Sequence, residues 1–206
     1  LVIQQLASVG LGALDVEHIF ISHSHGDHTL GFPMLALHRR NDHKLLHVYG
    51  GSSTLDTLRI LCAASYSALQ LLRANTYWHA LSEDGPDKTF IQEGITLTTD
   101  VVSHAPGTPT LAGRWDFEGR PSISFATDTI PTAATVNLAR GSNLLIHDSN
   151  YSAVLQPNTD PARTYHSTAR QAGEIARRAG CPHLALVHLS SEIGGSADLL
   201  AAEARA

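Results

Sequence analysis

Short apolar runs alternate with longer amphipathic segments along the whole chain. The apolar runs are rich in branched and aromatic residues and end at polar or glycine-containing turns, which is the pattern of buried β-strands. The strands predicted in this way cover residues 18–22, 45–50, 94–104, 111–117, 122–128, 143–148 and 183–189. The runs 111–117 and 122–128 flank the turn sequence Glu-Gly-Arg, so we expect them to form a hairpin.

Segments in which apolar residues recur at intervals of three and four lie between the predicted strands and indicate helices. They cover residues 29–40, 54–73, 132–140 and the stretch that follows Thr168. This last helix has the clearest ends, because Thr168 and Gln171 fit a capping box and Gly180 stops it. Strands and helices alternate without a repeat or a linker, which predicts one α/β domain over residues 1–206.

The composition is that of a folded enzyme-sized domain, with 206 residues, 43% hydrophobic and 16% charged. No apolar stretch of about 18 residues appears, so we expect no transmembrane helix. The net charge of -5 gives no whole-protein attraction for nucleic acid or an anionic membrane. Two cysteines without CxxC spacing favour a reducing compartment, so we expect a cytoplasmic protein.

The first residues, "LVIQQLASVG", lack a methionine and already have the pattern of a helix. We therefore expect the natural start to precede residue 1, which leaves a targeting segment open.

The stretch "HSHGDH" places His23, His25, Asp27 and His28 directly after the first predicted strand. The chain holds 13 histidines, so chance has to be weighed. At the chain's own composition, this pattern arises by accident in roughly 0.3% of cases. Imidazole and carboxylate are ordinary ligands of zinc and similar divalent ions, so the stretch predicts a metal-binding loop.

Three further candidates stand at the ends of later predicted strands: His104, Asp128 and His188. Each of them alone would more often be a structural or capping residue. Their order after the first cluster favours ligation, because buried strands fix the positions of the loops that follow them. Together with the first cluster they exceed what one tetrahedral ion needs, and they suit two ions that share a bridge.

The motifs "HSHGDH", "SHAPGTP", "ATDT" and "LVHLS" resemble those of the metallo-β-lactamase superfamily. That resemblance implies an αββα sandwich, here without its N-terminal strands, with a metal site at one edge of its two sheets. "LDVEHIFISHSHGDHTLGFPML", "LLIHDSNY" and "HSTARQAGEIARRAG" more specifically resemble the ribonuclease Z-like branch of metal-dependent phosphodiesterases. The likeness extends over about residues 1–190.

The resemblance implies a ligand set for two divalent ions, zinc first, with manganese or iron as alternatives. One ion would be held by His23, His25 and His104, the other by Asp27, His28 and His188, with Asp128 bridging. Asp27 is counted among the catalytic residues as well as the ligands. Two such ions activate a bridging hydroxide and hold a phosphoryl oxygen.

The resemblance also assigns His166 to the leaving-group side, as proton donor or stabiliser of developing charge, with Asp148 orienting it. Independently of the resemblance, His166 precedes a predicted helix N-terminus, where backbone N–H groups favour an anionic substrate. A surface or capping histidine is the plainer alternative. His147 would point away from Asp148 because side chains alternate along a strand. The remaining histidines, 18, 38, 43, 47, 79 and 183, are interpreted as structural or surface residues.

Two features differ from the family pattern. The strands, glycine-rich turn and Asp-x-Gly-like segment that normally precede the first histidine cluster are not in the sequence. Residues 29–103 contain no basic arm of the kind with which long-armed ribonuclease Z enzymes grip transfer RNA. With the negative net charge, a small phosphodiester is favoured over RNA as substrate.

The leading hypothesis is therefore a dinuclear-metal phosphodiesterase. Its alternatives are a ribonuclease Z-type transfer-RNA 3′-processing endonuclease, an arylsulfatase-type ester hydrolase, and a non-enzymatic binding protein stabilised by metal. The resemblance further suggests a homodimer and no membrane partner.

Overall fold

The computed structural model describes residues 2–41, 43–66, 75–193 and 195–206. The chain forms two compact units, Leu1–Leu81 and Ser82–Ala206. The combination of β-sheets and α-helices confirms the α/β class. A single domain over residues 1–206 stays a prediction.

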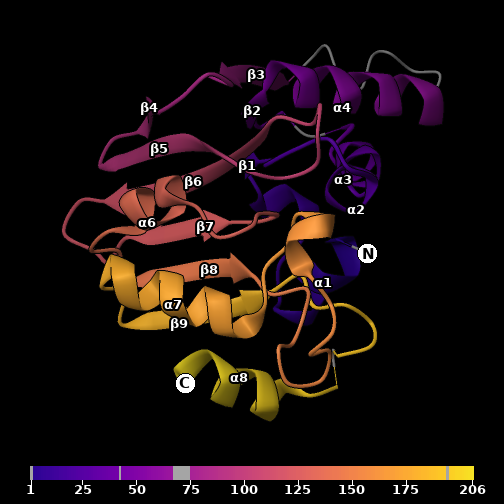
Figure 1. Ribbon diagram of the computed structural model, residues 1–206. Coiled ribbons are helices and arrows are strands. Elements are labelled where there is room, and N and C mark those ends of the chain that lie inside the picture. Colours follow the sequence, from indigo (N-terminus) through magenta and orange to yellow (C-terminus); the bar gives the residue numbers. More distant parts are fainter. Residues whose placement is uncertain (1, 42, 67–74, 194) are drawn as a thin grey trace. The chain divides into compact units, whose positions relative to one another are not determined.

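The first unit has a three-stranded parallel sheet in the order β1-β2-β3 (Figure 1). Its strands are β1 (His18–Phe20), β2 (Leu46–Gly51) and β3 (Thr76–Leu81). Its helices are α1 (Val2–Ser8), η1 (Ala13–Asp15), α2 (Gly26–Thr29), α3 (Phe32–His38) and α4 (Ser52–Ser65). Apolar residues of α1, α3 and α4 pack with Leu46 and Val48, so these helices cover one face of the sheet.

The predicted strands 18–22 and 45–50 and the helix within 29–40 are confirmed, with small shifts of their ends. The predicted helix 54–73 is confirmed as far as Ser65, and its part from residue 67 onward lies outside the described residues. Strand β3 was not predicted. Its sequence "TYWHAL" has a mixed burial pattern, so neither clear alternation nor a continuous apolar run identifies it.

The second unit has a six-stranded sheet in the order β4-β5-β6-β7-β8-β9. The strands are β4 (Asp87–Gln92), β5 (Ile95–Val102), β6 (Thr110–Phe117), β7 (Ile123–Ala126), β8 (Leu144–Asp148) and β9 (His183–Val187). Pairing is antiparallel from β4 to β7 and parallel from β7 to β9. The expected hairpin of β6 and β7 is therefore confirmed.

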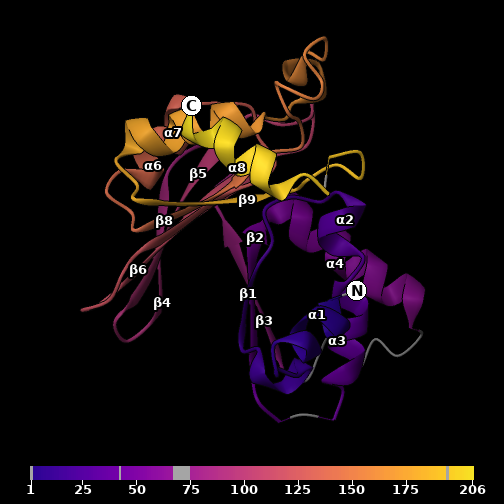
Figure 2. The same ribbon diagram turned by 90° about the horizontal axis from the view of Figure 1, so that it is seen from below.

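Helices α6 (Ala133–Ala139) and α7 (Ala169–Ala179) cover one face of this sheet (Figure 2). Val136 of α6 and Ile175 of α7 pack with Leu145 of β8 in a shared core. The short η2 (Pro161–Thr164) precedes α7, and α8 (Ala197–Arg205) packs against α7.

Helix α7 begins and ends where the sequence predicts. Thr168 accepts a hydrogen bond from the Gln171 backbone N–H at 3.2 Å, and the Gln171 side chain accepts one from the Thr168 N–H at 2.9 Å. Gly180 has a φ of 70°, the left-handed conformation that a helix C-terminus needs and that glycine adopts without strain. The capping box thus fixes the backbone immediately after His166.

Among the described residues, no helix combines the length and the apolar character that crossing a bilayer requires.

Candidate metal centre

The loop after β1 in the first unit gathers the residues of the "HSHGDH" motif. His25 is the N-cap of α2, and Asp27 and His28 lie within this short helix. The ring of His23 lies 4.7 Å from that of His25 and 4.2 Å from that of His28, centroid to centroid. Asp27 Oδ2 is 3.4 Å from His28 Nε2. The sequence motif therefore folds into a compact cluster of imidazole and carboxylate donors.

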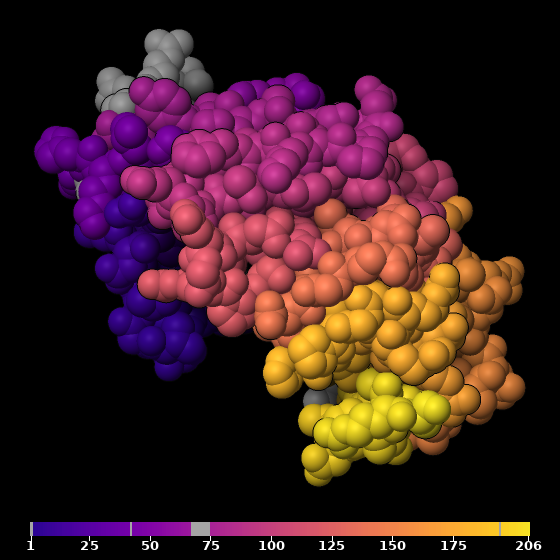
Figure 3. Space-filling model, turned by 90° about the vertical axis from the view of Figure 1, so that its left-hand side faces the viewer, coloured from indigo at the N-terminus to yellow at the C-terminus, as the bar shows by residue number. Residues whose placement is uncertain are grey.

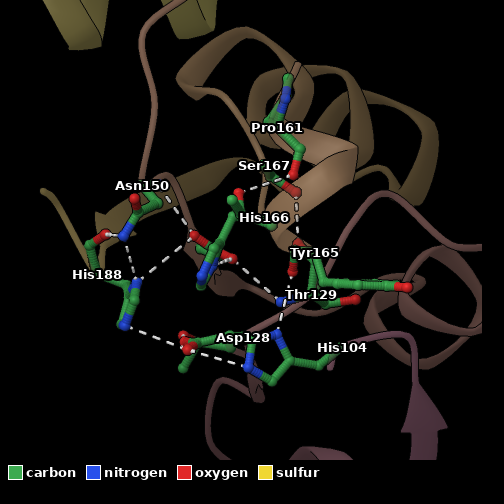
Figure 4. A network of polar contacts seen from close by, with 12 residues as sticks. His104, Asp128, Thr129, Asn150, Pro161, Tyr165, His166, Ser167 and His188 are labelled. Atoms are coloured by element: carbon green, nitrogen blue, oxygen red, sulfur yellow. Dashed lines mark hydrogen bonds and ion pairs between the residues drawn. The ribbon is translucent and has the colours of Figure 1, made fainter. Parts of the chain in front are cut away.

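The second unit places its three ligand candidates together (Figure 4). His104 follows β5, Asp128 follows β7 and His188 follows β9. Asp128 Oδ2 lies 3.2 Å from His188 Nε2 and 3.8 Å from His104 Nε2. This carboxylate is 1% exposed and stands between the two imidazoles, which is the position that a bridging ligand requires.

The backbone fixes the orientation of His104. Its Nδ1 lies 3.1 Å from the carbonyl oxygen of Tyr165, to which it can only donate. The proton therefore sits on Nδ1, and the Nε2 lone pair points toward Asp128. A ligating histidine that donates its other N–H to a carbonyl is the usual arrangement at protein metal sites.

Asn150 orients His188 through two contacts. Its Nδ2 is 2.8 Å from His188 Nδ1 and 3.1 Å from the His188 carbonyl oxygen. An amide nitrogen only donates, so Nδ1 accepts in this arrangement. Ligation through Nε2 requires the proton on Nδ1, with the Asn150 amide turned so that its oxygen faces the ring. With the amide turned, its oxygen accepts from the ring Nδ1–H, and the hydrogen bond from Asn150 to the His188 carbonyl oxygen is lost.

Asp148 and His166 form a pair beside these ligands. The Asp148 carboxylate is fully buried and accepts hydrogen bonds from the backbone N–H of Thr129 at 3.1 Å and of Asn150 at 2.9 Å. His166 Nδ1 lies 2.9 Å from Asp148 Oδ2. The His166 ring stacks on His188 at 5.0 Å and lies 5.2 Å from His104. The pair is thus in contact with two of the ligand candidates.

His147 is fully buried on β8, and its Nδ1 lies 2.8 Å from the carbonyl oxygen of Asp148. Burial lowers its pKa from the usual value, which keeps the imidazole neutral. Its Nε2 has no hydrogen-bond partner among the described residues. His147 is therefore a core residue.

The donor set of the second unit fits a divalent metal ion. It combines imidazole nitrogens with carboxylate oxygens, and the rings are held by hydrogen bonds from their far side. Donor atoms of Asp148, His166 and His188 also lie within 4.8 Å of one another. These residues of the second unit therefore support the binding of a divalent metal ion.

Sequence reasoning missed the residues that orient the ligands: Asn150 and the carbonyl of Tyr165, together with Thr127, whose hydroxyl donates to Asp128. Asn150 could have been suspected, because it stands two positions after Asp148 at the same strand end. The Tyr165 carbonyl could not, because any residue type supplies it.

A family model described as "Beta-lactamase superfamily domain" matches residues 3–189. The chain belongs to this family. It is 29% identical to "Ribonuclease Z" of Halorubrum lacusprofundi over 92% of this chain and 75% of that protein. It is 30% identical to "Ribonuclease Z" of Natronomonas pharaonis over 98% of this chain and 79% of that protein. The resemblance to the ribonuclease Z-like branch is thereby confirmed.

Solved structures show the same fold. The metallo-beta-lactamase fold protein YhfI from Bacillus subtilis has a TM-score of 0.76 at 24% identity, covering 97% of this chain and 74% of that one. Human tRNase Z, short form, has a TM-score of 0.76 at 21% identity, covering 92% and 78%. The chain is a hydrolase of the metallo-β-lactamase fold.

Proposed function

We propose that this hydrolase cleaves phosphodiesters with two divalent metal ions, zinc in the first place. In this proposal His23, His25 and His104 hold one ion and Asp27, His28 and His188 hold the other, with Asp128 between them. The ions would supply a metal-activated hydroxide and charge neutralisation at the phosphoryl oxygens.

The observation that supports phosphodiester chemistry most directly is the Asp148–His166 pair. The contact of Asp148 Oδ2 with His166 Nδ1 puts the transferable proton of the imidazole at Nε2. When an alkyl phosphodiester is hydrolysed, the leaving group is an alkoxide, which needs a proton or a positive charge as the P–O bond breaks. His166 can give that proton, and the buried Asp148 carboxylate stabilises the imidazolium beforehand.

His166 also stands just before Thr168, the N-cap of α7. The first backbone N–H groups of a helix carry partial positive charge and attract anions. A phosphate group near His166 would therefore meet an environment that suits its charge.

Processing of transfer-RNA 3′ ends is the second candidate. It is favoured by the curated relatives, which carry the name "Ribonuclease Z". The net charge of -5 argues for a smaller substrate, because phosphate contacts from Lys and Arg supply much of RNA affinity. A "New Diphosphatase from the PhnP Family" has the same fold, at a TM-score of 0.57 and 20% identity over 84% of this chain and 60% of that one, and its name describes an enzyme that acts on a diphosphate.

The deciding experiment uses bis(4-nitrophenyl) phosphate, an unspecific aryl phosphodiester. We expect hydrolysis that a chelator abolishes and that Zn²⁺ or Mn²⁺ restores. Absence of turnover with every divalent metal would exclude this function and favour the metal-stabilised binding protein. Turnover of 4-nitrophenyl sulfate in preference to the phosphodiester would favour the arylsulfatase-type alternative.

A precursor transfer RNA with a 3′ extension separates the two phosphodiesterase candidates. Cleavage at one defined position, with a much higher kcat/KM than for the aryl ester, would favour the processing endonuclease. Hydrolysis of the aryl ester alone would favour a small substrate.

The proposal also includes a cellular compartment and an oligomeric state. Cys62 and Cys181 are both free thiols, which suits a reducing compartment such as the cytoplasm. A homodimer is proposed from the family resemblance, and sedimentation equilibrium would test it.

A further inference from the structure

Glu203 in helix α8 is a buried carboxylate that does not belong to the ligand candidates. It is 4% exposed. Its oxygens accept hydrogen bonds from Ser152 Oγ at 2.7 Å, from the Ala153 backbone N–H at 2.7 Å and from the Arg170 backbone N–H at 3.2 Å. A buried carboxylate is costly unless several donors compensate it, and three donors do so here. This set of contacts is called the Glu203 bridge below.

The Glu203 bridge joins two segments that come from different parts of the second unit. Ser152 and Ala153 belong to the loop after β8, and Arg170 lies in the first turn of α7. The positive end of the α7 dipole adds to the attraction for the carboxylate. Arg170 thus contributes to the bridge through its backbone N–H rather than through its side chain.

The same two segments carry the residues of the site. Asp148 and Asn150 precede Ser152, and His166 precedes Arg170. Between these ends the segments pair directly: the Tyr151 N–H donates to the Ser167 carbonyl at 3.2 Å, and the Ala169 N–H donates to the Tyr151 carbonyl at 3.0 Å. The two paired segments are therefore joined by Glu203 at one end and by the contact of Asp148 with His166 at the other end.

Ser152 strengthens the loop side of the bridge. It is fully buried, and its Oγ accepts hydrogen bonds from the backbone N–H groups of Val154 at 3.2 Å and Leu155 at 3.0 Å while donating to Glu203. The turn after Asn150 therefore depends on a hydroxyl that Glu203 holds in place.

A glycine brings α8 close enough for this contact. A Cβ at Gly173 of α7 would lie 1.8 Å from the Ala204 carbonyl oxygen, so only glycine permits the two helices to approach at this point. Leu200 of α8 packs with Ala169 and Ile193 in a small apolar core on the same side. Figure 3 shows residues 197–205 lying against the surface formed by the α7 region. Close packing and the Glu203 bridge thus act at the same helix contact.

We propose that Glu203 is a positioning residue for the proposed phosphodiester hydrolysis. It acts through the paired segments 150–153 and 166–170 to hold His166 against Asp148. The expected effect on kcat rests on the proposed function, whereas the link between the two segments rests on the hydrogen bonds alone. It predicts that loss of the Glu203 charge impairs the proton-transfer step more than the binding of substrate.

The test compares the full chain with its Glu203→Gln variant in hydrolysis of a dinucleoside phosphate, an alkyl phosphodiester whose alkoxide leaving group needs a proton. Glutamine keeps the volume and one acceptor oxygen for the two backbone donors, which share Oε1, but its NH2 group then faces the Ser152 hydroxyl, whose oxygen already accepts two backbone N–H groups. We expect kcat to fall about tenfold, with KM and metal content unchanged. Glu174→Gln is the matched control, since Glu174 is an exposed carboxylate of α7, and it should leave kcat unchanged.

A double-mutant cycle with His166→Ala identifies the route of the effect. If Glu203 acts through His166, then Glu203→Gln causes no further loss of kcat in the His166→Ala background. Losses that multiply in the double variant would overturn the proposal, as would wild-type kcat in Glu203→Gln. Should Glu203→Gln fold poorly, Ser152→Ala removes one donor of the bridge and is expected to reduce kcat in the same non-additive way, and additive loss there would overturn the proposal equally.

Hydrogen exchange separates failure of this inference from failure of the proposed function. In Glu203→Gln, the amides of Ala153, Ala169 and Arg170 should exchange at least about tenfold faster, whereas those of the β5–β6 pairing stay protected. This result does not depend on turnover. If exchange at these three amides is unchanged in Glu203→Gln, the bridge is refuted even when the enzyme is active. If the wild type is inactive but exchange is faster in the variant, only the proposed function is refuted.

Discussion

His166 Nδ1 lies 2.9 Å from Asp148 Oδ2, and the two residues come from different elements of the second unit. Asp148 ends strand β8, and His166 precedes the capping box of α7. The Asp148 carboxylate also accepts hydrogen bonds from two backbone N–H groups, so its position does not depend on His166 alone. The pair therefore has a defined tautomer and orientation, which a proton donor requires.

Replacement of His166 by alanine should remove the proposed leaving-group proton. We expect kcat on a dinucleoside phosphate, whose alkoxide leaving group needs a proton, to fall about 10²–10⁴-fold, the usual contribution of general acid catalysis, with metal content unchanged. His183→Ala is the control, because His183 is an exposed histidine at the start of β9. Equal kcat in His166→Ala and wild type, at full metal content, would exclude the role given to His166.

Replacement of Asp148 by asparagine should reduce both stability and activity. Three donors face this carboxylate: the N–H groups of Thr129 and Asn150 and the ring of His166. An asparagine amide would oppose one of them with its own N–H, which costs about 1–3 kcal/mol of the free energy of unfolding. Urea unfolding measures this loss, and a variant as stable as wild type would show that the buried carboxylate is not held as described.

The sequence predicted most of the second unit because its signals are local. The capping box at Thr168 and Gln171, the glycine at position 180 and the alternation over 94–104 each depend on neighbouring residues. Strand β4 and helix α8 were not predicted. Helix α8 is rich in alanine and polar residues, so apolar spacing marks it weakly, and its position depends on the contact with Gly173.

The ligand candidates of the site could be predicted from the sequence, but the groups that orient them could not. Spacing singled out "HSHGDH", and strand ends singled out His104, Asp128 and His188. The orientation of these rings depends on the Tyr165 carbonyl and on Asn150, and the Glu203 contact comes from the other end of the unit. Such contacts are created by folding and have no pattern in sequence.

Replacement of His147 by leucine should be tolerated, because leucine fills a similar volume in the core. We expect the free energy of unfolding at pH 8 to fall by about 1–3 kcal/mol, because leucine removes the N–H that His147 Nδ1 donates to the Asp148 carbonyl oxygen. His147→Ala should instead cost about 2–5 kcal/mol through the cavity that it leaves. Equal losses in the two variants would show that the imidazole itself matters.

The pKa of His79 predicts a loss of stability in acid. Burial lowers this pKa, and the neighbouring imidazoles of His47 and His18 lower it further. His47 Nδ1 lies 2.9 Å from His79 Nε2, and the Tyr49 ring stacks on His79 at 4.3 Å. The folded state thus binds this proton more weakly than the unfolded state, whose pKa is about 6.5. The stabilisation is fully present above that pH and is lost as the pH falls below it.

His79→Gln should therefore reduce the slope of unfolding free energy against pH below about pH 6.5. Urea unfolding from pH 8 to pH 5 measures that slope for both proteins. His38→Gln is the control, because His38 lies at the exposed end of α3. An unchanged slope in His79→Gln would contradict the pKa shift.

The central claim is a centre of two divalent ions that depends on Asp128, and metal stoichiometry tests it most directly. The full chain, loaded with Zn²⁺ and freed of excess metal, should contain two ions per chain by mass spectrometry of the elements. Asp128→Asn should contain at most one, whereas Asp116→Asn, at an aspartate whose carboxylate pairs with Arg114, should keep both. Full metal content in Asp128→Asn, or no tightly held ion in the wild-type chain, would contradict the account.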